Sequence, residues 1–425
     1  MNIEHIYRQR IGDPQYNTSY PLRPSDWKEF RREGALPFKA GEFSFYIHIP
    51  FCKHLCSFCE YTRMLCPDKK TQLHYVEAIE NDMERFAETH EDGLLLGFDI
   101  GGGTPTALNE EVFERLARTF SHHSERLAHT ADYEPSIEAS FDTLSQGKLE
   151  IIGQSGIKRL SLGVQSASDR VLESNHRQTQ DIRTMEKVIN MAHKCGILKI
   201  NLDFMYGLKE QTEESLRHDL EVIKTLQPEQ VTTYELRTNM IAETSHTTPE
   251  QRYAMYNHLY EGLTEMGYHA PFGQNTFSKE REDMGVSSYL RHRMREGCAY
   301  KGFGLSAQSL SSSGISYNIG KNSRILPSLL TLPSFEEEYT YLLPTTELAS
   351  KYIAIAAYSG AFSVKRLSEI LGEDARKFYK EPLDFCLGSE LMSQEGDLLR
   401  ITRKGFRHYG ATFSLFYDYK HPNHE

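Results

Sequence analysis

Between residues 43 and 236 the chain alternates short apolar runs with longer amphipathic ones. Such short runs are typical of buried strands, and the longer ones of helices with one packed face. The strand candidates are SFYIHI, LLLGFDI, PSIEAS, GIKRLSLGV, ILKINLDFM and QVTTYEL. Strands that alternate with helices form a parallel sheet, because each helix returns the chain to the edge where the next strand begins. Six such units in about 195 residues predict a partial (β/α)6 TIM-like barrel rather than a closed barrel of eight units.

The rest of the chain divides into three regions. Residues 1–42 are polar and lack a sustained period, which predicts an irregular N-terminal arm that lies on the body. Residues 237–335 contain one helical pattern and the Gly/Ser-rich run YKGFGLSAQSLSSSGISYNIG, whose composition indicates a loop; we interpret this region as a barrel extension that covers the substrate. Residues 336–425 predict helices, a hairpin with its turn at EGD, a last helix and a short tail, which together indicate a small winged-helix-like domain.

Composition excludes several classes of protein. A formal net charge of -11 provides no electrostatic attraction for nucleic acid or for an anionic membrane surface. The longest apolar runs are too short and too polar for a membrane span, and the N-terminus has charges where a signal peptide needs an apolar segment. We therefore expect a cytoplasmic protein. In that compartment clustered cysteines bind metal or perform redox chemistry more often than they form disulfides.

Three of the seven cysteines, Cys52, Cys56 and Cys59, directly follow the first predicted strand with the spacing C-x3-C-x2-C. Loops that follow strands form the active face of a (β/α) barrel, so the position and the chemistry of these residues agree. A structural zinc site needs four ligands, and His48 or His54 would have to complete it, because the remaining cysteines are scattered singly. A 4Fe-4S cluster held by three thiolates instead leaves one iron free to bind a further ligand.

This motif, directly after YIHIPF, resembles the signature of the radical S-adenosylmethionine (radical SAM) superfamily. The wider sequence resembles its HemN-like branch, the oxygen-independent coproporphyrinogen III oxidase family. The resemblance implies a 4Fe-4S cluster on Cys52, Cys56 and Cys59, whose open iron binds the amino and carboxylate groups of SAM. It further implies that one electron from the cluster splits SAM into methionine and a 5′-deoxyadenosyl radical. Function at low oxygen and a low-potential electron donor of the flavodoxin or ferredoxin type are also implied.

The resemblance continues in order through the barrel, in GGGTPT after the second predicted strand and in SIEAS, RLSLGVQS, NHRQT and NLDFMYGLKEQT further on. It implies SAM contacts at Tyr46, Phe58, Gly102, Gly103, Thr104, Glu138, Gln165, Arg177 and Asp203. The last three match positions that contact a second SAM molecule in the coproporphyrinogen oxidase, so two bound SAM molecules are implied. The polar members of this set follow apolar runs, which predicts that they lie at the mouth of the barrel.

The chain departs from the coproporphyrinogen oxidase at identifiable positions. FCEYTRM has no further thiol shortly after the third cysteine, and the next one is Cys66. The run YKGFGLSAQS resembles a stretch shared by haem chaperones and radical SAM methylases. Arg237 and Gln308 stand where that oxidase has apolar residues near SAM, and we assign them no role.

Three functions from different classes therefore stay open. In the first, the radical abstracts hydrogen from a large planar substrate, and the enzyme decarboxylates a propionate side chain of a tetrapyrrole or opens a porphyrin ring. In the second, a class C radical SAM methyltransferase uses two SAM molecules to methylate an sp2 carbon. In the third, the protein is a HemW-type haem chaperone, for which His292 or His269 would supply the haem ligand. We carry the first forward as the main hypothesis.

Overall fold

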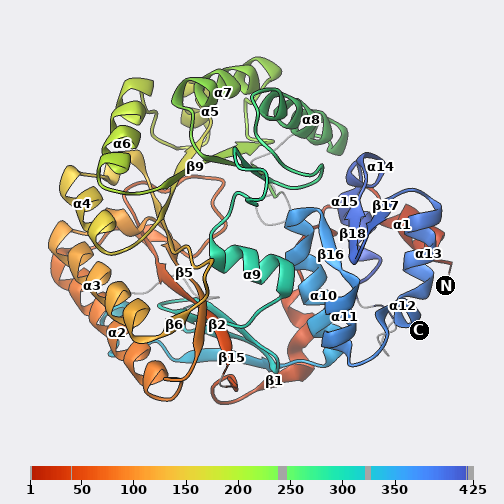
Figure 1. The fold of residues 1–425 in the computed structure, drawn as a ribbon, viewed down its shortest axis with the longest axis horizontal. Coiled ribbons are helices and arrows are strands. Elements are labelled where there is room, and N and C mark those ends of the chain that lie inside the picture. The colour runs from red at the N-terminus through yellow and green to blue at the C-terminus, as the bar shows by residue number, and fades with distance from the viewer. Residues whose placement is uncertain (1, 40, 238–246, 321–326, 418, 420–425) are drawn as a thin grey trace.

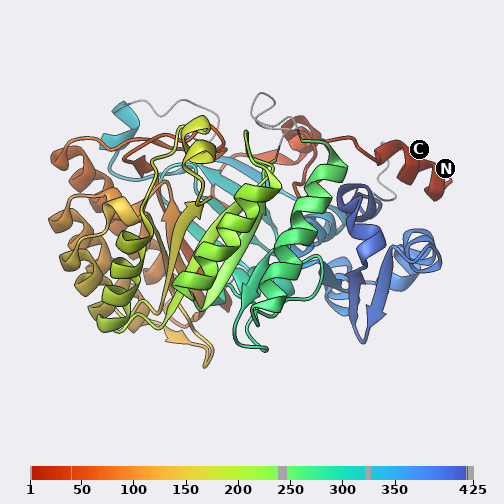
Figure 2. The ribbon, with the colours of Figure 1, turned by 90° about the horizontal axis from the view of Figure 1, so that it is seen from above.

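The computed structural model describes residues 2–39, 41–237, 247–320, 327–417 and 419. A curved, parallel sheet with helices on its outer face forms a partial barrel (Figures 1 and 2). Its strands include β2 (Glu42–Ile49), β5 (Leu94–Gly102), β7 (Ser136–Ala139), β8 (Arg159–Gln165), β9 (Lys199–Tyr206) and β10 (Gln230–Glu235). Each strand of this series pairs in parallel with the next one. All six strands predicted from the sequence are thus confirmed.

Amphipathic helices cover the outer face of the barrel. They are α2 (Lys69–Glu88), α3 (Glu110–Arg126), α4 (Gln146–Gln154), α5 (Asp169–Ser174), α6 (Ile182–Lys194), α7 (Glu213–Leu226) and α8 (Pro249–Glu265). Asp68 caps the N-terminus of α2, because its carboxylate accepts a hydrogen bond from the backbone N–H of Thr71 at 3.1 Å. Gly196 follows the end of α6 at a φ of 85°, a left-handed conformation that favours glycine. Apolar side chains of the strands and of these helices form the barrel core.

The Gly/Ser-rich run is not a loop, contrary to the sequence-based prediction. It forms β12 (Tyr300–Phe303), β13 (Gln308–Ser311) and β14 (Gly314–Asn318). β12 adds a seventh parallel strand beside β2, and β13 and β14 continue the sheet antiparallel. A Cβ on Gly302 would lie 2.3 Å from the carbonyl oxygen of Gln308, and one on Gly314 would lie 1.9 Å from that of Tyr341. These glycines therefore mark close approach between paired strands, which composition alone does not distinguish from a loop.

The sheet has further short strands at its margins. Beyond β14 it continues through β15 (Glu337–Leu342) to β1 (Arg31–Arg32), both antiparallel. At the other end β11 (Thr276–Ser278) pairs antiparallel with β10, and β6 (Ala128–His129) pairs with β5. Short 3-10 helices connect several elements: η1 (Pro24–Phe30), η2 (Pro105–Ala107), η3 (Phe141–Thr143), η4 (Pro327–Thr331) and η5 (Ala357–Ser359).

Helices and a hairpin form the C-terminal part of the chain, as the sequence predicts. The helices are α10 (Thr345–Ala356), α11 (Val364–Leu371), α12 (Ala375–Phe378), α13 (Lys380–Gly388), α14 (Arg403–Phe406) and α15 (Tyr409–Ser414). The hairpin strands β17 (Met392–Glu395) and β18 (Leu398–Ile401) pair antiparallel, and β16 (Ala361–Ser363) adds a third strand. The predicted tail from residue 420 lies outside the described residues. Among the described helices, none combines the length and apolar content that crossing a lipid bilayer requires.

Helix α9 (Ser288–Glu296) lies between the barrel and the C-terminal helices (Figure 1). It packs against β5 on one side and against α10 and β16 on the other. A Cβ on Gly97 of β5 would lie 2.2 Å from the backbone nitrogen of Tyr289, so this glycine allows the helix to approach the strand. Helix α9 thereby joins the two parts of the molecule.

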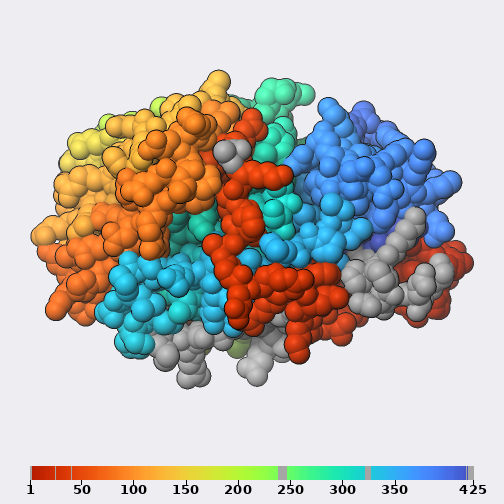
Figure 3. Space-filling view, turned by 90° about the horizontal axis from the view of Figure 1, so that it is seen from below, coloured from red at the N-terminus to blue at the C-terminus, as the bar shows by residue number. Residues whose placement is uncertain are grey.

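The N-terminal arm contains more regular structure than predicted. Helix α1 (Ile3–Arg10) begins at Asn2 and packs its apolar side chains against the C-terminal core, with the ring centroid of Tyr7 at 5.5 Å from that of Phe385. An isolated helix of eight residues is unstable in water, so these tertiary contacts, which the sequence does not reveal, stabilise it. Figure 3 shows the arm, in red, passing beside the light-blue segment that includes β14 and β15.

A buried carboxylate fastens the arm to α10. The hydroxyl of Tyr20 and the indole N–H of Trp27 both donate to Oε2 of Glu347, at 2.8 and 2.6 Å. Lys351 donates from the same helix to the backbone carbonyl of Tyr20 at 2.8 Å. Since Glu347 is only 3% exposed, both hydrogen bonds are shielded from water and hold the arm in place.

Candidate cofactor site

The three clustered cysteines lie in the loop that follows β2. Two short parallel strands, β3 (Phe51–Cys52) and β4 (Met64–Leu65), close this loop at its base. Within the loop, Nη2 of Arg63 donates to the backbone carbonyl oxygens of Cys56 and Cys59 at 2.5 and 3.2 Å. Cys52 and Cys56 are buried and Cys59 is half-buried. The loop is therefore held in one shape by its own backbone and by one guanidinium group.

The spacing of the three sulfurs separates the two kinds of metal centre that the sequence left open. A tetrahedral zinc ion with Zn–S bonds of about 2.3 Å places its sulfurs roughly 3.8 Å apart. In the described part of the chain, the groups of three or more candidate ligands that lie within 4.8 Å of one another do not include the cysteine trio. His48 lies 2.9 Å from the carbonyl oxygen of Thr62, and His54 lies 3.6 Å from a carboxylate oxygen of Asp142, so both histidines have other contacts. At least one pair of the three sulfurs therefore lies more than 4.8 Å apart, which is wider than a single tetrahedral zinc ion places them.

No fourth thiol joins the trio among the described residues. The thiol of Cys66 donates to the carbonyl oxygen of Ala107 and accepts from the side-chain amide of Gln72, each at 3.3 Å. The remaining cysteines lie in other elements: Cys195 at the end of α6, Cys298 after α9 and Cys386 in α13. A 4Fe-4S cluster bound here would therefore have one iron without a protein thiolate.

Burial raises the pKa of the Cys52 thiol to about 11, and it also raises the pKa of Cys59. Both thiols are therefore protonated near neutral pH when no metal is bound. Metal ligands must be thiolates, so binding of a cluster has to release these protons.

The glycine-rich turn after β5 packs directly against the cysteine loop. Backbone N–H groups of Gly103 and Thr104 donate to the carbonyl oxygens of Ile49 and Phe51, each at 2.8 Å. A Cβ on Gly103 would lie 2.9 Å from Sγ of Cys52, which leaves no room for a side chain. The hydroxyl of Thr104 lies 3.9 Å from the same sulfur. Glycine is thus required where the turn meets the first cysteine.

Glu138 faces the interior of the barrel beside this turn. It accepts a hydrogen bond from the backbone N–H of Gly102 at 3.0 Å, and it is the one exposed residue of the otherwise buried strand β7. Desolvation of the carboxylate inside the barrel raises the pKa of Glu138 to about 7, and the nearby negative charge of Asp203 adds to this shift. The hydrogen bond from Gly102 opposes it. On β2, at the other side of β5, the hydroxyl of Tyr46 lies 3.4 Å from Nδ1 of His48. These groups form a polar wall that continues from the glycine turn.

Arg177 reaches from the loop after α5 to the cysteine loop. Its Nη1 lies 3.5 Å from Sγ of Cys56, and its Nη2 donates to the backbone carbonyl of Gly163. Gln165 ends β8 at a φ of 73°, and a Cβ on Gly163 would lie 2.9 Å from its side-chain nitrogen. The structure therefore brings Gln165 and Arg177 together, as predicted for strand ends, and adds a contact between Arg177 and a cysteine that the sequence did not reveal.

Asp203 lies deeper in the barrel, in a network of buried polar side chains. Its carboxylate accepts from the hydroxyl of Ser161 at 3.0 Å and from the amide of Asn201 at 2.8 Å. Arg159, only 4% exposed, donates to the side-chain oxygen of Gln230 at 2.6 Å. A small cavity is lined by Asp99, Ser136, Glu138, Arg159, Ser161, Thr232 and Tyr234, among others. The sequence analysis did not identify Asp99 or Arg159 as site residues, although each is a charged residue in a strand that is otherwise largely apolar.

The aromatic residues of the predicted set lie at the walls of the same site. The Tyr46 ring stacks on that of Tyr289 from α9, with centroids 5.8 Å apart and planes at 17°. Phe58, between the second and third cysteines, packs against the buried side chains of Leu208 and Leu236. The structure thus places all nine predicted SAM contacts on the cysteine loop, on the strands of the barrel or in the segments that follow those strands. Their role in binding SAM stays a prediction.

Arg237, to which the sequence assigned no role, connects the cysteine loop to the arm. Its guanidinium lies 3.5 Å from a carboxylate oxygen of Glu60, which follows Cys59, and donates to the hydroxyl of Ser19 at 2.9 Å. Beside it lies a hollow bounded by the arm, the ends of β9 and β10, α8 and residues 406–411. Its lining includes Arg10, Arg237, Arg252 and Arg407. Gln308, in contrast, lies among tyrosines and donates to the hydroxyl of Tyr317 at 2.6 Å.

Residues 46–223 match the family model of the radical SAM superfamily. Two curated proteins illustrate the similarity of the whole chain. It is 27% identical to the heme chaperone HemW of Bacillus subtilis over 377 residues, which covers 85% of this chain and 96% of that protein. It is 26% identical to the oxygen-independent coproporphyrinogen III oxidase of Escherichia coli over 310 residues, which covers 70% of this chain and 65% of that protein.

A solved structure extends the comparison to the fold. The coproporphyrinogen III oxidase HemN of Escherichia coli superimposes with a TM-score of 0.72 at 22% sequence identity. The superposition covers 90% of this chain and 91% of the other. The two proteins therefore share the barrel and most of the surrounding elements.

Proposed function

We propose that this chain, which belongs to the HemN-like branch of the radical SAM superfamily, is an enzyme that acts on a tetrapyrrole substrate. The observation that carries the proposal is the set of three thiols in the loop after β2, without a fourth thiol among the described residues nearby. Such a set suits a 4Fe-4S cluster with one iron that can bind SAM. When bound, the cluster and SAM together supply a 5′-deoxyadenosyl radical that abstracts hydrogen from a substrate.

The residues of the chain would then position SAM and exclude water. The backbone of Gly102 and Gly103 lies close enough to the cysteine loop to contact the amino acid part of SAM, because neither residue has a side chain in the way. Glu138 offers carboxylate oxygens for hydroxyl donors or for the positive sulfonium. Arg177 places a positive charge beside Cys56, where it offsets part of the negative charge that three thiolates bring.

A tetrapyrrole is supported by the hollow next to the site. Porphyrins and porphyrinogens carry carboxylate side chains, and guanidinium groups bind carboxylates with paired hydrogen bonds. Arg252 pairs with Glu235 at 2.7 Å, whereas Arg407 has no ion pair among the described residues and is exposed at the edge of the hollow. Both relatives are named for tetrapyrroles, one as a coproporphyrinogen oxidase and one as a heme chaperone. We propose that Arg407 contacts a carboxylate of the substrate.

A haem chaperone is the second candidate, and the long alignment with HemW favours it. That function requires an accessible haem ligand. His292 does not meet this requirement, because it is only 7% exposed and its two ring nitrogens lie 3.1 Å from Glu296 and 3.4 Å from Asp132. His269, the other candidate, is half-buried beside β11. We therefore place the enzymatic function first.

The test uses anaerobically reconstituted protein with SAM, dithionite and coproporphyrinogen III. The proposal expects 5′-deoxyadenosine whose yield rises with the tetrapyrrole, together with carbon dioxide from the propionate side chain. S-adenosylhomocysteine in equal amount would instead indicate methyl transfer, and tight haem binding without SAM cleavage would indicate the chaperone; either result would contradict the proposal. Cys56→Ala should abolish the product, whereas the matched control Cys195→Ala, at the end of α6, should keep it.

A further inference from the structure

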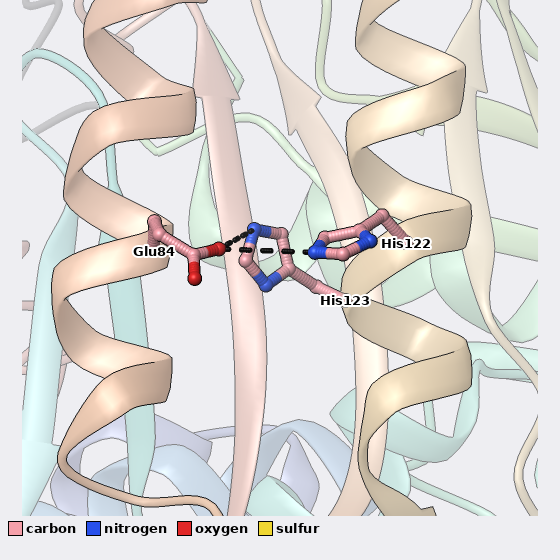
Figure 4. Close-up of side chains that lie close together, drawn as sticks. All are labelled: Glu84, His122 and His123. Atoms are coloured by element: carbon pink, nitrogen blue, oxygen red, sulfur yellow. Dashed lines mark ion pairs between the residues drawn. The ribbon is translucent and has the colours of Figure 1, made fainter.

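Two helices on the outside of the barrel bring one carboxylate and two imidazoles together. Glu84 lies near the end of α2, and His122 and His123 lie near the end of α3 (Figure 4). Helices of a (β/α) barrel run back from the edge where the strands end, so the ends of these helices lie toward the opposite face from the loop after β2. This group is therefore separate from the cysteine site.

The spacing of the three side chains suits a single metal ion. Oε2 of Glu84 lies 3.7 Å from Nε2 of His122 and 4.0 Å from Nε2 of His123, and all three ligand atoms lie within 4.8 Å of one another. Metal–nitrogen and metal–oxygen bonds of about 2.0–2.1 Å place tetrahedral ligand atoms roughly 3.4 Å apart. The two carboxylate–imidazole separations exceed this spacing by about 0.3 and 0.6 Å, which small side-chain rotations can close.

His123 supplies an independent reason to expect a ligand. It is 3% exposed, its Nε2 faces Oε2 of Glu84 at 4.0 Å, and its Nδ1 has no hydrogen-bond partner in the described part of the chain. Buried polar groups are nearly always satisfied by protein, water or an ion.

Neighbouring ion pairs hold the carboxylate in a suitable orientation. Arg126 donates to Oε1 of Glu84 at 2.6 Å and to Glu91 at 2.7 Å, so Oε2 is the oxygen that faces the imidazoles. A second bridge between the helices, from Arg115 to Glu80 at 2.6 Å, fixes α3 against α2. His122 keeps 63% of its side chain exposed, so a metal ion and a water ligand can enter from solvent.

A second group of comparable size is a weaker candidate. His292, Glu296 and Cys298 also lie within 4.8 Å of one another. There, however, Nδ1 of His292 is hydrogen-bonded to Glu296 at 3.1 Å, and the thiol of Cys298 donates to the same carboxylate at 3.4 Å. Hydrogen bonds within this group already satisfy these atoms, so the group needs no metal.

We propose that Glu84, His122 and His123 form a site for a divalent transition-metal ion of the zinc class, with water as the fourth ligand. Two imidazoles and one carboxylate are a common protein ligand set for zinc. The ion joins α2 to α3 at the side of the barrel away from the cysteine loop. This site does not depend on the proposed enzymatic function.

The first test measures Zn²⁺ binding to anaerobically reconstituted protein, whose cluster cysteines are already occupied. The proposal expects one site whose affinity falls at least about tenfold in His122→Ala, an exposed position where the substitution should leave the fold intact. His74→Ala is the matched control. Like His122, His74 is an exposed histidine, but it lies on α2 and has a single carboxylate beside it, that of Glu77 at 3.3 Å. Equal affinity in wild type and His122→Ala would overturn the proposal.

X-ray absorption at the zinc edge provides a second readout. The expected spectrum has nitrogen and oxygen neighbours at about 2.0–2.1 Å and no sulfur near 2.3 Å. A sulfur shell would place the ion on cysteines and overturn the assignment. Glu84→Gln tests the carboxylate in the same way: it should lose the site while its circular dichroism and cluster content stay unchanged, and retention of zinc would contradict the proposal.

Discussion

The guanidinium of Arg177 lies 3.5 Å from the sulfur of Cys56 and is also hydrogen-bonded to the end of β8. One side chain therefore couples the cysteine loop to the strand that carries Gln165. A fixed positive charge at this distance stabilises the more negative, reduced state of any cluster bound by the three thiolates. This contact leads to the first prediction.

Arg177→Met keeps most of the length of the side chain and removes its charge. We expect the midpoint potential of the reconstituted cluster to fall by on the order of 50 mV, because a reduced cluster loses a nearby cation. An EPR-monitored redox titration measures this shift. Arg170→Met is the control, since Arg170 is exposed on α5 and pairs with Glu210. An unchanged potential in Arg177→Met would show that the charge does not act on the cluster.

Gly103→Ala should prevent assembly of the cluster. The added Cβ would lie 2.9 Å from Sγ of Cys52 and 2.8 Å from the backbone of Pro50, so the loop or the turn must shift. Iron and acid-labile sulfide content after reconstitution should fall to a small fraction of the wild-type value. Gly388→Ala is the matched control, because a Cβ there meets no atom within 4 Å. Full iron content in Gly103→Ala would refute the role assigned to this turn.

Glu138→Gln should weaken SAM binding and remove its pH dependence. The pKa of Glu138 is raised to about 7, so the wild-type carboxylate becomes ionised as the pH rises through 7. Ionised Glu138 attracts the sulfonium charge, and we therefore expect SAM affinity to increase between about pH 6 and pH 8 in the wild type. Calorimetry under anaerobic conditions measures this affinity.

Glutamine still accepts the hydrogen bond from Gly102, so Glu138→Gln should keep the geometry and show a nearly flat, roughly tenfold weaker profile at pH 8. If SAM affinity changed with pH equally in the wild type and in Glu138→Gln, a group other than Glu138 would be responsible for the pH dependence.

Trp27→Phe should lower stability without changing the cofactor site. The substitution removes the N–H that donates to the buried carboxylate of Glu347 at 2.6 Å. Loss of one hydrogen bond to a buried charged group costs about 1.5–3 kcal/mol of unfolding free energy. Chemical denaturation followed by circular dichroism gives the value. Tyr339→Phe is the control, because the hydroxyl of Tyr339 has no hydrogen-bond partner in the described part of the chain; equal losses in both variants would contradict the anchoring role.

The barrel could be predicted because its signals are local. Buried parallel strands such as β5 are nearly continuous apolar runs, and a cap such as Asp68 is readable from the chain alone. The position of the cysteines followed from the same reasoning, since a loop after a strand must lie at one edge of the sheet.

Other features depend on contacts between distant segments. Gly314 lies in a strand because its missing side chain admits the carbonyl of Tyr341, and no local pattern indicates that partner. Helix α1 exists because Tyr7 and its neighbours pack on the C-terminal core. The contact of Arg177 with Cys56 joins residues 121 positions apart through a loop whose shape sequence periodicity does not describe. Charged residues inside apolar strands, such as Arg159, were the one overlooked signal.

Iron and sulfide analysis combined with EPR of the reduced, reconstituted protein tests the central claim most directly. The three-cysteine assignment predicts about four irons and four acid-labile sulfides per chain, and a reduced-cluster spectrum that changes when SAM is added because SAM binds the open iron. One tightly bound zinc without sulfide, or a cluster spectrum that SAM leaves unaltered, would contradict it.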